Sequence, residues 1–382
     1  MNDWKIFSLG DLAKIKYGKN QKKVQSDDGK FPIYGTGGLI GYANKFLYDK
    51  PSVLIGRKGS ISKVKFIDKP FWTVDTLFYT EINESLAIPK FLYYSLSSID
   101  LYHYNEGTTI PSLRTETLNK LEINLPPLET QKKIAAVLSS LDDKIELNNQ
   151  INKNLEQQAQ AIFKNYFVDN FNSDWKEIYL SEIANFIGGY SYKGNELKIS
   201  DTAMVTIKNF NRNGGFKLDG LKEIQPSAKL KIEHDINLFD VVVAHTDLTQ
   251  NAEIIGNAEN ILSFGGYKKI IFSMDVVKVV PKNDKVSKFL LGEILRTKEF
   301  KNHCLGYVNG TTVLHLSKKA LPEYKLFFPT DFSVLNEIDK IIFAVYEKIS
   351  TNIEENLRLA EMRDLLLPKL LSGEIDVSKV EI

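Results

Sequence analysis

The sequence predicts an α+β protein in which two repeats of a mixed α/β domain are separated by two long helices packed antiparallel. Three observations carry this prediction. Blocks of sequence recur in the same order in both halves of the chain. Strand-like runs with glycine-rich turns fill the first part of each half, and a long segment with helical apolar spacing ends it. The length of 382 residues also exceeds that of one ordinary domain.

The repeat rests on three matching blocks. Their order never changes, and the offset between the halves grows as insertions in loops would make it grow. Ordered agreement at three blocks is not expected by chance, so we interpret the chain as duplicated. The matching blocks are residues 3–5 (Asp-Trp-Lys) with 174–176, residues 90–92 (Lys-Phe-Leu) with 288–290, and Gly107–Ile110 (Gly-Thr-Thr-Ile) with Gly310–Val313 (Gly-Thr-Thr-Val).

Short strands and turns open each half. In the first half, Phe31–Tyr34 runs into a glycine-rich stretch at 35–38, and Ser52–Ile55 has strand character. In the second half, Asp240–Ala244 is the equivalent strand and leads into His245–Asp247. Both halves are therefore expected to begin with a β-rich domain.

A long helix is expected to end each half. Residues 131–165 contain no glycine or proline, and apolar residues from Ile134 to Ile145 recur at spacings of four, three and four. Residues 334–367 show a similar apolar series, and Pro368 is expected to stop this helix. A small β-rich domain cannot bury so long a stripe alone, so we expect the two helices to pack on each other.

Asparagines interrupt both apolar stripes. Buried amides at such positions would fix the register of the helix pair at some cost in stability. The alternative is that these side chains are merely solvated. The residues concerned are Asn148, Asn152, Asn352 and Asn356.

These patterns divide the chain into four parts. Residues 1–129 form the first mixed domain, 130–172 the first long helix, 173–330 the second mixed domain and 331–382 the second long helix. Their net charges are +3, 0, +3 and −5. The positive excess of the two mixed domains is small, and alone it only weakly suggests nucleic acid.

Composition excludes several classes of protein. A hydrophobic fraction of 43% is enough for real cores, and no run of apolar residues is long enough to span a membrane. The single cysteine, Cys304, excludes a disulfide framework and a cysteine-based zinc site. The first ten residues include Asp3 and no apolar run, so no secretory signal is expected. A cytoplasmic protein is expected.

Four segments resemble one known family, the DNA-specificity subunits of Type I restriction-modification systems. Residues 126–145 resemble the beginning of that family's central helix, and Leu365–Ile375 resembles its C-terminal signature. Tyr34–Gly38 and Ile55–Ser60 resemble parts of its target recognition domains. The resemblance covers essentially the whole chain, although the second helix lacks the Pro-Pro-Leu-Glu sequence that begins the first.

This resemblance implies a non-catalytic subunit with no cofactor. Each target recognition domain would read one half of a bipartite, asymmetric double-stranded DNA target. The paired helices would space the domains and dock two methyltransferase subunits, and motor-nuclease subunits would complete the complex. A duplicated reader on a helical spacer also suits two half-sites about one DNA turn, roughly 34 Å, apart. The alternatives are a stand-alone DNA-binding protein or decoy, and a self-sufficient nuclease.

Motifs for an independent enzyme are incomplete. Gly18–Asn20 lacks the Ser or Thr of a Walker loop, and Ile40 replaces the third glycine of a dinucleotide fingerprint. Asn124–Pro127 is a near miss for the Asn-Pro-Pro-Tyr motif of amino-methyltransferases. His245 and Asp247 could share a strand face, but two ligands leave a metal site open. We therefore expect neither a catalytic site nor a metal site.

Polar side chains next to predicted strands and turns are the candidate DNA contacts, since Lys and Arg suit phosphates and Arg, Asn, Gln, Ser and Thr suit base edges. The alternative in each case is an ordinary solvated turn. Candidates in the first domain are Lys19, Tyr34, Thr36, Tyr42, Arg57, Lys58, Ser60, Lys63, Thr108, Thr109 and Arg114. Candidates in the second domain are Lys208, Asn209, Arg212, His245, Thr246, Asp247, Thr249, Gln250, Thr311, Thr312 and His315. The two sets differ, as expected if the domains read different sequences.

Overall fold

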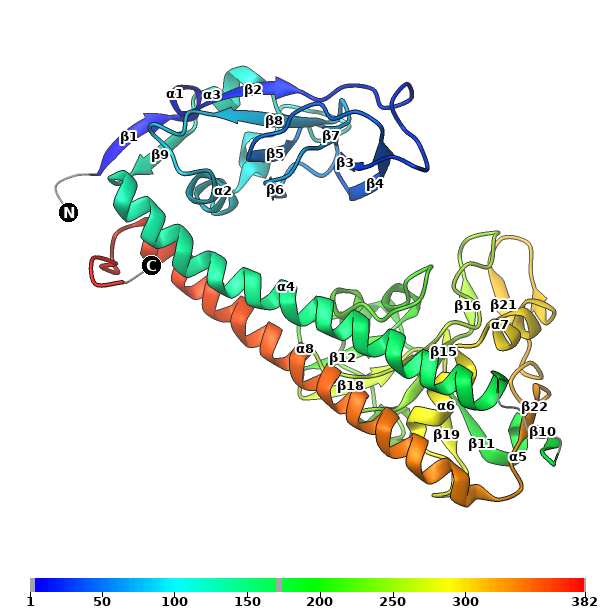
Figure 1. Cartoon of the computed structure of the whole chain (residues 1–382). Helices are drawn as coiled ribbons and strands as arrows, with labels where there is room; N and C mark the ends of the chain where they lie inside the picture. The colour runs from blue at the N-terminus through cyan, green and yellow to red at the C-terminus, as the bar shows by residue number, and fades with distance from the viewer. Residues whose placement is uncertain (1–3, 170–173, 381–382) are drawn as a thin grey trace. The chain divides into compact units, whose positions relative to one another are not determined.

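The computed structural model describes residues 4–169 and 174–380 (Figure 1). The chain forms two compact units. The first unit contains residues up to Lys144 together with the chain from Leu359 onward, and the second contains Ile145–Arg358. Each unit therefore combines one repeat with a segment of both long helices. The predicted boundary between residues 172 and 173 lies outside the described residues, as does Asp3.

The first unit is built from short strands and three short helices. Its strands are β1 (Lys5–Ser8), β2 (Ala13–Tyr17), β3 (Phe31–Gly35), β4 (Gly38–Ala43), β5 (Ser52–Gly56), β6 (Val64–Ile67), β7 (Trp72–Thr73), β8 (Leu77–Ile82) and β9 (Glu122–Leu125). Its short helices are α1 (Leu9–Leu12), α2 (Pro89–Ser97) and α3 (Thr115–Asn119), with a 3₁₀ turn at Leu101–Tyr104. An antiparallel sheet has the order β2-β8-β5-β6, and a smaller sheet has the order β4-β3-β7 with β3 and β7 parallel.

The second unit repeats this plan with more connecting turns. Its strands are β10 (Lys176–Tyr179), β11 (Ala184–Gly188), β12 (Thr202–Val205), β13 (Lys222–Glu223), β14 (Asp235–Ile236), β15 (Val241–Ala244), β16 (Thr246–Asp247), β17 (Ala258–Asn260), β18 (Lys269–Phe272), β19 (Val276–Pro281), β20 (Val308–Asn309), β21 (Leu314–Leu316) and β22 (Lys325–Phe328). Its short helices are α5 (Leu180–Ile183), α6 (Lys288–Leu295) and α7 (Lys298–Leu305). Its 3₁₀ turns span Gly194–Glu196, Ile207–Asn209, Leu218–Gly220, Ile232–His234 and Phe332–Val334.

Sheet topology confirms the predicted duplication. The order β11-β19-β15-β17 corresponds strand by strand to β2-β8-β5-β6, and the parallel pair of β12 with β18 corresponds to that of β3 with β7. Gly18 and Gly189 occupy the same place in the two repeats. A Cβ atom on Gly18 would lie 2.0 Å from the Val74 carbonyl oxygen, and one on Gly189 would lie 2.0 Å from that of Ser273. Both positions therefore require glycine.

The two long helices are α4 (Leu128–Lys164), which continues as a π-helical turn at Asn165–Asp169, and α8 (Leu335–Leu371). Their segments run antiparallel in both units, as predicted. In the first unit Asp142 of α4 accepts a 2.7 Å hydrogen bond from Arg363 of α8. In the second unit Asn152 of α4 accepts one of 2.7 Å from Asn352.

The expectation that Pro368 stops the second helix is wrong, because α8 continues to Leu371. A proline this close to the helix end removes one backbone donor, and few turns remain to be disturbed. The Ser372 N–H still bonds to the Pro368 carbonyl at 3.0 Å, and Leu370 is buried. The helix ends at Leu371, and Gly373 follows with a φ of +74°, the left-handed conformation that favours glycine.

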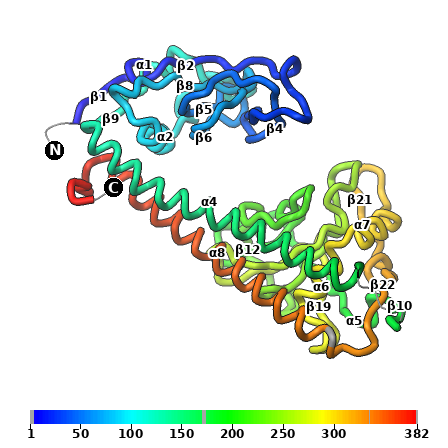
Figure 2. Tube along the Cα trace, in the orientation of Figure 1, coloured from blue at the N-terminus to red at the C-terminus, as the bar shows by residue number. Residues whose placement is uncertain are grey.

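After Gly373 the chain turns back toward the start of α4 (Figure 2). Lys133 of α4 donates a 2.5 Å hydrogen bond to the Ser378 carbonyl, and Val377 is buried. The C-terminal segment therefore packs on the first unit.

Buried amides connect the two long helices in the second unit. Asn148, Asn152 and Asn352 are almost completely buried. Asn148 donates to Asn356 at 2.9 Å, in addition to the Asn152–Asn352 hydrogen bond. The interpretation that the amides are merely solvated is therefore wrong for Asn148, Asn152 and Asn352, whereas Asn356 is partly exposed. Each buried amide has a partner across the helix pair, so a register shift would leave polar groups unpaired.

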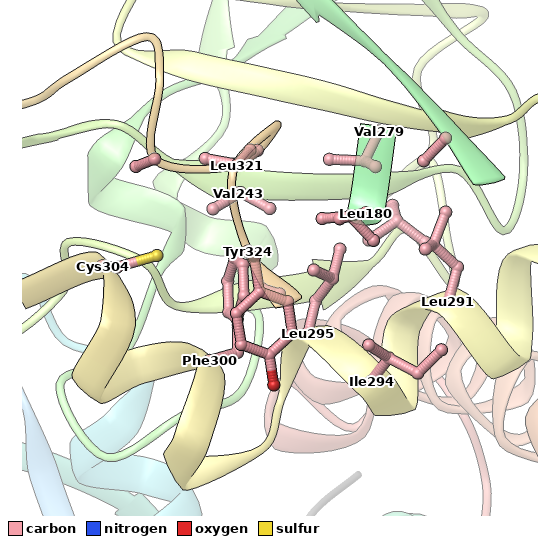
Figure 3. Packing of buried hydrophobic residues seen from close by; sticks show 14 of the residues in the cluster. Leu180, Val243, Val279, Leu291, Ile294, Leu295, Phe300, Cys304, Leu321 and Tyr324 are labelled. Atoms are coloured by element: carbon pink, nitrogen blue, oxygen red, sulfur yellow. The ribbon is translucent and has the colours of Figure 1, made fainter. Parts of the chain in front are cut away.

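The main core of the second unit lies between the sheet β11-β19-β15-β17 and the helices α6 and α7 (Figure 3). Val243 and Val279 come from the sheet, Leu291 and Ile294 from α6, and Cys304 from α7. All five side chains are buried. Burial also raises the pKa of the Cys304 thiol to about 12.

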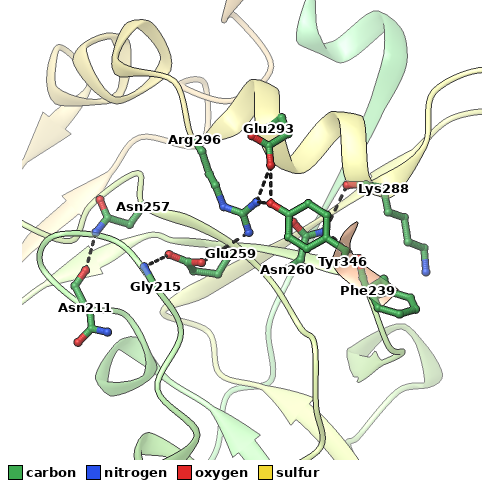
Figure 4. Close-up of polar contacts among 10 residues, drawn as sticks. All are labelled: Asn211, Gly215, Phe239, Asn257, Glu259, Asn260, Lys288, Glu293, Arg296 and Tyr346. Atoms are coloured by element: carbon green, nitrogen blue, oxygen red, sulfur yellow. Dashed lines mark hydrogen bonds and ion pairs between the residues drawn. The ribbon is translucent and has the colours of Figure 1, made fainter. Parts of the chain in front are cut away.

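Each repeat is attached to the helix pair by a polar joint. In the first unit, Tyr94 of α2 donates a 2.6 Å hydrogen bond to Asp142 of α4. In the second unit, the Arg296 guanidinium lies 3.2 Å from Glu293 and 3.6 Å from Glu259, and both Arg296 and Glu293 are hydrogen-bonded to Tyr346 of α8 (Figure 4). The two joints use different residues, although the repeats share a fold.

Replacing one buried amide should destabilise the second unit. In Asn152→Ala the Asn352 amide keeps its burial and loses its partner, which should cost about 1–3 kcal/mol of unfolding free energy. Replacing both residues by leucine should cost much less, because no polar group is then left unpaired. Urea unfolding of the full chain measures both, with the exposed Asn154→Ala as the control. A loss in Asn152→Ala no larger than in the control would contradict this account.

Cys304 should resist thiol reagents in the folded protein. A buried thiol with a raised pKa holds almost no thiolate at about pH 8. A chromogenic disulfide reagent should therefore label no thiol in buffer and one thiol per chain in denaturant. Rapid labelling of the native chain would show that the α7 core is open.

Candidate DNA interface

One loop in the first unit begins where the buried strand β5 ends. Arg57 is its first residue. The Arg57 N–H donates a 2.9 Å hydrogen bond to the Thr76 carbonyl, and the Arg57 carbonyl accepts one of 3.0 Å from the Leu113 N–H. These bonds hold the loop at 57–63 beside the turn at Gly107–Ile110. Sequence positions far apart thus form one surface.

The Arg57 side chain is oriented by two neighbours. Its guanidinium carbon lies 5.1 Å from the centre of the Tyr17 ring, and Nη1 donates a 2.9 Å hydrogen bond to the Asp75 carbonyl. A cation over an aromatic face is attracted by the ring quadrupole. Tyr17 itself is half exposed, so this pair lies at the protein surface.

The second unit builds the same backbone arrangement around His245. The His245 N–H donates a 2.9 Å hydrogen bond to the Asp275 carbonyl, and its carbonyl accepts one of 2.9 Å from the Leu316 N–H. The Gly310–Val313 turn corresponds to Gly107–Ile110. Burial and the neighbouring His315 lower the pKa of His245, so its imidazole is neutral near pH 7.

Glycine is required at the start of both repeated turns. A Cβ on Gly107 would lie 1.9 Å from the Ile110 carbonyl oxygen, and one on Gly310 would lie 2.2 Å from that of Val313. The two threonines that follow are exposed in each turn. The repeated Gly-Thr-Thr block therefore encodes one shared turn that projects polar side chains.

The structure brings most first-domain candidates onto two surfaces. The first surface carries the β5 loop and the repeated turn, and the second is the β3–β4 hairpin. Exposed candidates on or beside the first surface are Lys58, Ser60, Lys63, Thr108, Thr109 and Arg114, with Arg57 partly buried. Lys19 is exposed and lies beside β7, where its N–H donates a 2.8 Å hydrogen bond to the Thr73 carbonyl. On the hairpin, Tyr34 and Thr36 are partly buried and Tyr42 is exposed.

Second-domain candidates divide into exposed and buried groups. The exposed or partly exposed candidates are Lys208, Arg212, His245, Thr249, Gln250, Thr311, Thr312 and His315. Gln250 donates a 3.4 Å hydrogen bond to the Thr311 carbonyl, which brings the loop after β16 to the repeated turn. Arg212 is distant in the sequence from the loop after β16 and from the repeated turn. It forms a 2.9 Å ion pair with Glu253.

Asn209, Thr246 and Asp247 are buried, and their polar atoms already bond within the unit. Asn209 accepts from the Thr206 N–H and donates to the Lys217 carbonyl. Asp247 accepts from the N–H groups of Thr249 and Ile254. Thr246 and Asp247 form strand β16.

Two features escaped the sequence analysis. The Tyr17 ring lies against the Arg57 guanidinium. Helix and strand periodicity relates only residues that are close in the sequence, so it could not predict this contact. The Arg296 joint borders a cavity of about 510 Å³, whose lining includes Arg212, Glu259 and Lys301. Its residues come from the second repeat and from both helices, so only the fold brings them together.

In residues 4–169 and 174–380, no group of three or more His, Cys, Asp and Glu side chains is placed to hold a metal ion. In the same part of the chain, no helix combines the length and the apolar character that crossing a bilayer requires.

Comparison with known proteins gives consistent matches. Residues 1–157 match the family model of the Type I restriction modification DNA specificity domain. The specificity subunit of the Type I restriction enzyme HindI from Haemophilus influenzae is 26% identical over 471 residues, which cover 98% of this chain and 100% of that protein. A putative type I specificity subunit of Mycoplasma genitalium is 29% identical over 401 residues, covering 99% and 96%.

A solved structure shares the fold. The crystal structure of a Type I restriction-modification S subunit from M. genitalium matches with a TM-score of 0.61 at 20% sequence identity, covering 97% of this chain and 96% of that chain. The chain thus has a duplicated fold with polar loops at corresponding positions in its two repeats. Over almost its whole length the chain is similar to DNA-specificity subunits of Type I restriction-modification systems, and residues 1–157 match the model of the family's DNA specificity domain.

Gly107→Ala should displace the repeated turn. The added Cβ cannot coexist with the Ile110 carbonyl, so the backbone must move, and we expect a loss of more than about 1 kcal/mol in unfolding free energy. Gly37→Ala is the matched control, because a Cβ there meets no atom within 4 Å. Thermal unfolding compares the two variants. Equal stability would show that the turn tolerates a side chain.

Proposed function

We propose that this chain is the non-catalytic subunit that reads a bipartite, asymmetric double-stranded DNA target for a Type I restriction-modification complex. The observation that carries this proposal is one backbone scaffold, used twice, with different side chains. Arg57 and Tyr17 mark it in the first repeat, whereas His245 and Gly188 stand at the corresponding positions in the second. A shared backbone scaffold with different side chains suits two domains that each recognise a different DNA sequence.

The four sequence-defined parts then have distinct roles. Residues 1–129 read one half-site and 173–330 read the other. The helical parts, 130–172 and 331–382, set the separation of the half-sites. The exposed candidates named above contact bases or phosphates, and the buried Asn209, Thr246 and Asp247 shape the loops that present them.

The long helices also offer docking surfaces for partners. Large apolar side chains stay exposed on both helices: Leu147 is 50% exposed on α4, and Leu365 is 62% and Met362 51% exposed on α8. Apolar side chains at a protein surface favour burial by a partner. They support docking of two methyltransferase subunits, with motor-nuclease subunits joining the complex. Methyl transfer and DNA cleavage would then belong to these partners, acting in the cytoplasm.

Exchanging the first domain should change one half of the target only. A chimera carries residues 1–129 of another specificity subunit, and it is expressed with the methyltransferase in cells that lack other modification systems. Sequencing of methylated sites should show a new first half-site beside the original second half-site. The reciprocal exchange of residues 173–330 is the matched control. Both half-sites changing in one chimera would refute modular reading.

The same cells separate a specificity subunit from a stand-alone DNA-binding protein. Methylation at the bipartite target should require both this chain and the methyltransferase, and the chain should co-purify with that partner. Binding to DNA without co-purification or methylation would favour the stand-alone alternative.

A further inference from the structure

Arg57 and His245 occupy the same position by strand register as well as by hydrogen bonding. Gly56 lies opposite Leu77 in the β5–β8 pair, and Ala244 lies opposite Val276 in the β15–β19 pair. The next residue is Arg57 in the first repeat and His245 in the second. In both cases the backbone N–H and carbonyl bond to the equivalent segments.

The support beneath the two side chains differs. Tyr17 lies opposite Phe78 in the β2–β8 pair, and Gly188 lies opposite Val277 in the β11–β19 pair, so Gly188 corresponds to Tyr17. A Cβ on Gly188 would meet no atom within 4 Å. The aromatic ring that supports Arg57 in the first repeat is thus absent from the second, and the backbone at Gly188 leaves room for a Cβ atom.

Arg57 is prepared for bidentate recognition. Within the described residues, the Asp75 carbonyl is the hydrogen-bond partner of its side chain, so the other guanidinium N–H groups remain available. Stacking on Tyr17 limits the rotamers of Arg57 before a ligand arrives, which lowers the entropy cost of binding. A guanidinium fork matches the O6 and N7 acceptors of guanine in the major groove.

His245 presents different chemistry at the same position. A neutral imidazole has one donor and one acceptor and cannot form the guanidinium fork. Within the described residues no hydrogen bond to its ring is found, and the side chain is partly buried.

We propose that Arg57 and His245 are corresponding specificity-determining residues, and that Arg57 reads a guanine in the first half-site. This inference rests on the proposed DNA-reading function. It assigns one base contact to one side chain and names Tyr17 as the residue that positions it.

The test uses the complex of the full chain with its methyltransferase and a pool of DNA duplexes with a randomised centre. Sequencing of bound duplexes gives the base preference at each position. Arg57→Ala should reduce the preference for guanine at one position of the first half-site by about tenfold to a hundredfold. The second half-site should stay the same. Lys16→Ala is the control, because it removes a positive charge next to Tyr17 from the opposite face of β2.

A transplant tests the correspondence independently of any loss of folding. His245→Arg with Gly188→Tyr should bring a guanine preference to the second half-site and leave the first unchanged. An unchanged second half-site would overturn the equivalence of the two positions.

The remaining outcomes are also decisive. Uniformly weaker binding by Arg57→Ala with every base preference retained would make Arg57 a phosphate contact and overturn the proposal. A wild-type complex that selects no sequence at all would contradict the proposed function itself. A bipartite motif that is unaffected by Arg57→Ala would contradict the base assignment alone.

Discussion

The packing of α4 against α8 is the constraint on which the rest of the structure depends. Neither repeat completes its core with its own strands. The first core includes Ile134 and Leu138 of α4 and Leu370 of α8. In the second unit Ala159 of α4 packs with Ile342 of α8 and Phe289 of α6. Each unit takes one segment from each helix, and the buried Asn152–Asn352 pair fixes the helix register within the second unit.

The two repeats share one backbone framework and differ in the side chains on its surface. Glycines at 18 and 189, and at 107 and 310, face backbone too closely to be replaced, so both repeats keep the same turns. Side chains that point away from this frame carry no such restriction. The polar joints show the same freedom, since Tyr94–Asp142 in one unit and Arg296–Tyr346 in the other attach equivalent helices with different chemistry.

Local pattern predicts the repeat, both long helices, and strands at Ser52–Ile55 and Asp240–Ala244, because strand and helix periodicity appears among residues that are close in the sequence. The observed strands are Ser52–Gly56 and Val241–Ala244. Local pattern misplaced the end of α8, because burial of Leu370 outweighs the single donor that Pro368 removes. It also could not separate Asp247, which is buried and bonded, from exposed Gln250 three residues later. Burial of polar loop residues depends on tertiary contacts, as does the pairing of Tyr17 with Arg57.

The central claim is that the helix pair sets the gap between the two DNA half-sites. The units divide after Lys144 on α4 and after Arg358 on α8, so matched insertions at these two points leave the packing inside each unit unchanged. About seven residues in each helix nearly preserve its phase and add roughly 10 Å. At about 3.4 Å per base pair, methylome sequencing should show the same half-sites separated by about three more base pairs. Full methylation at the original gap would contradict the claim.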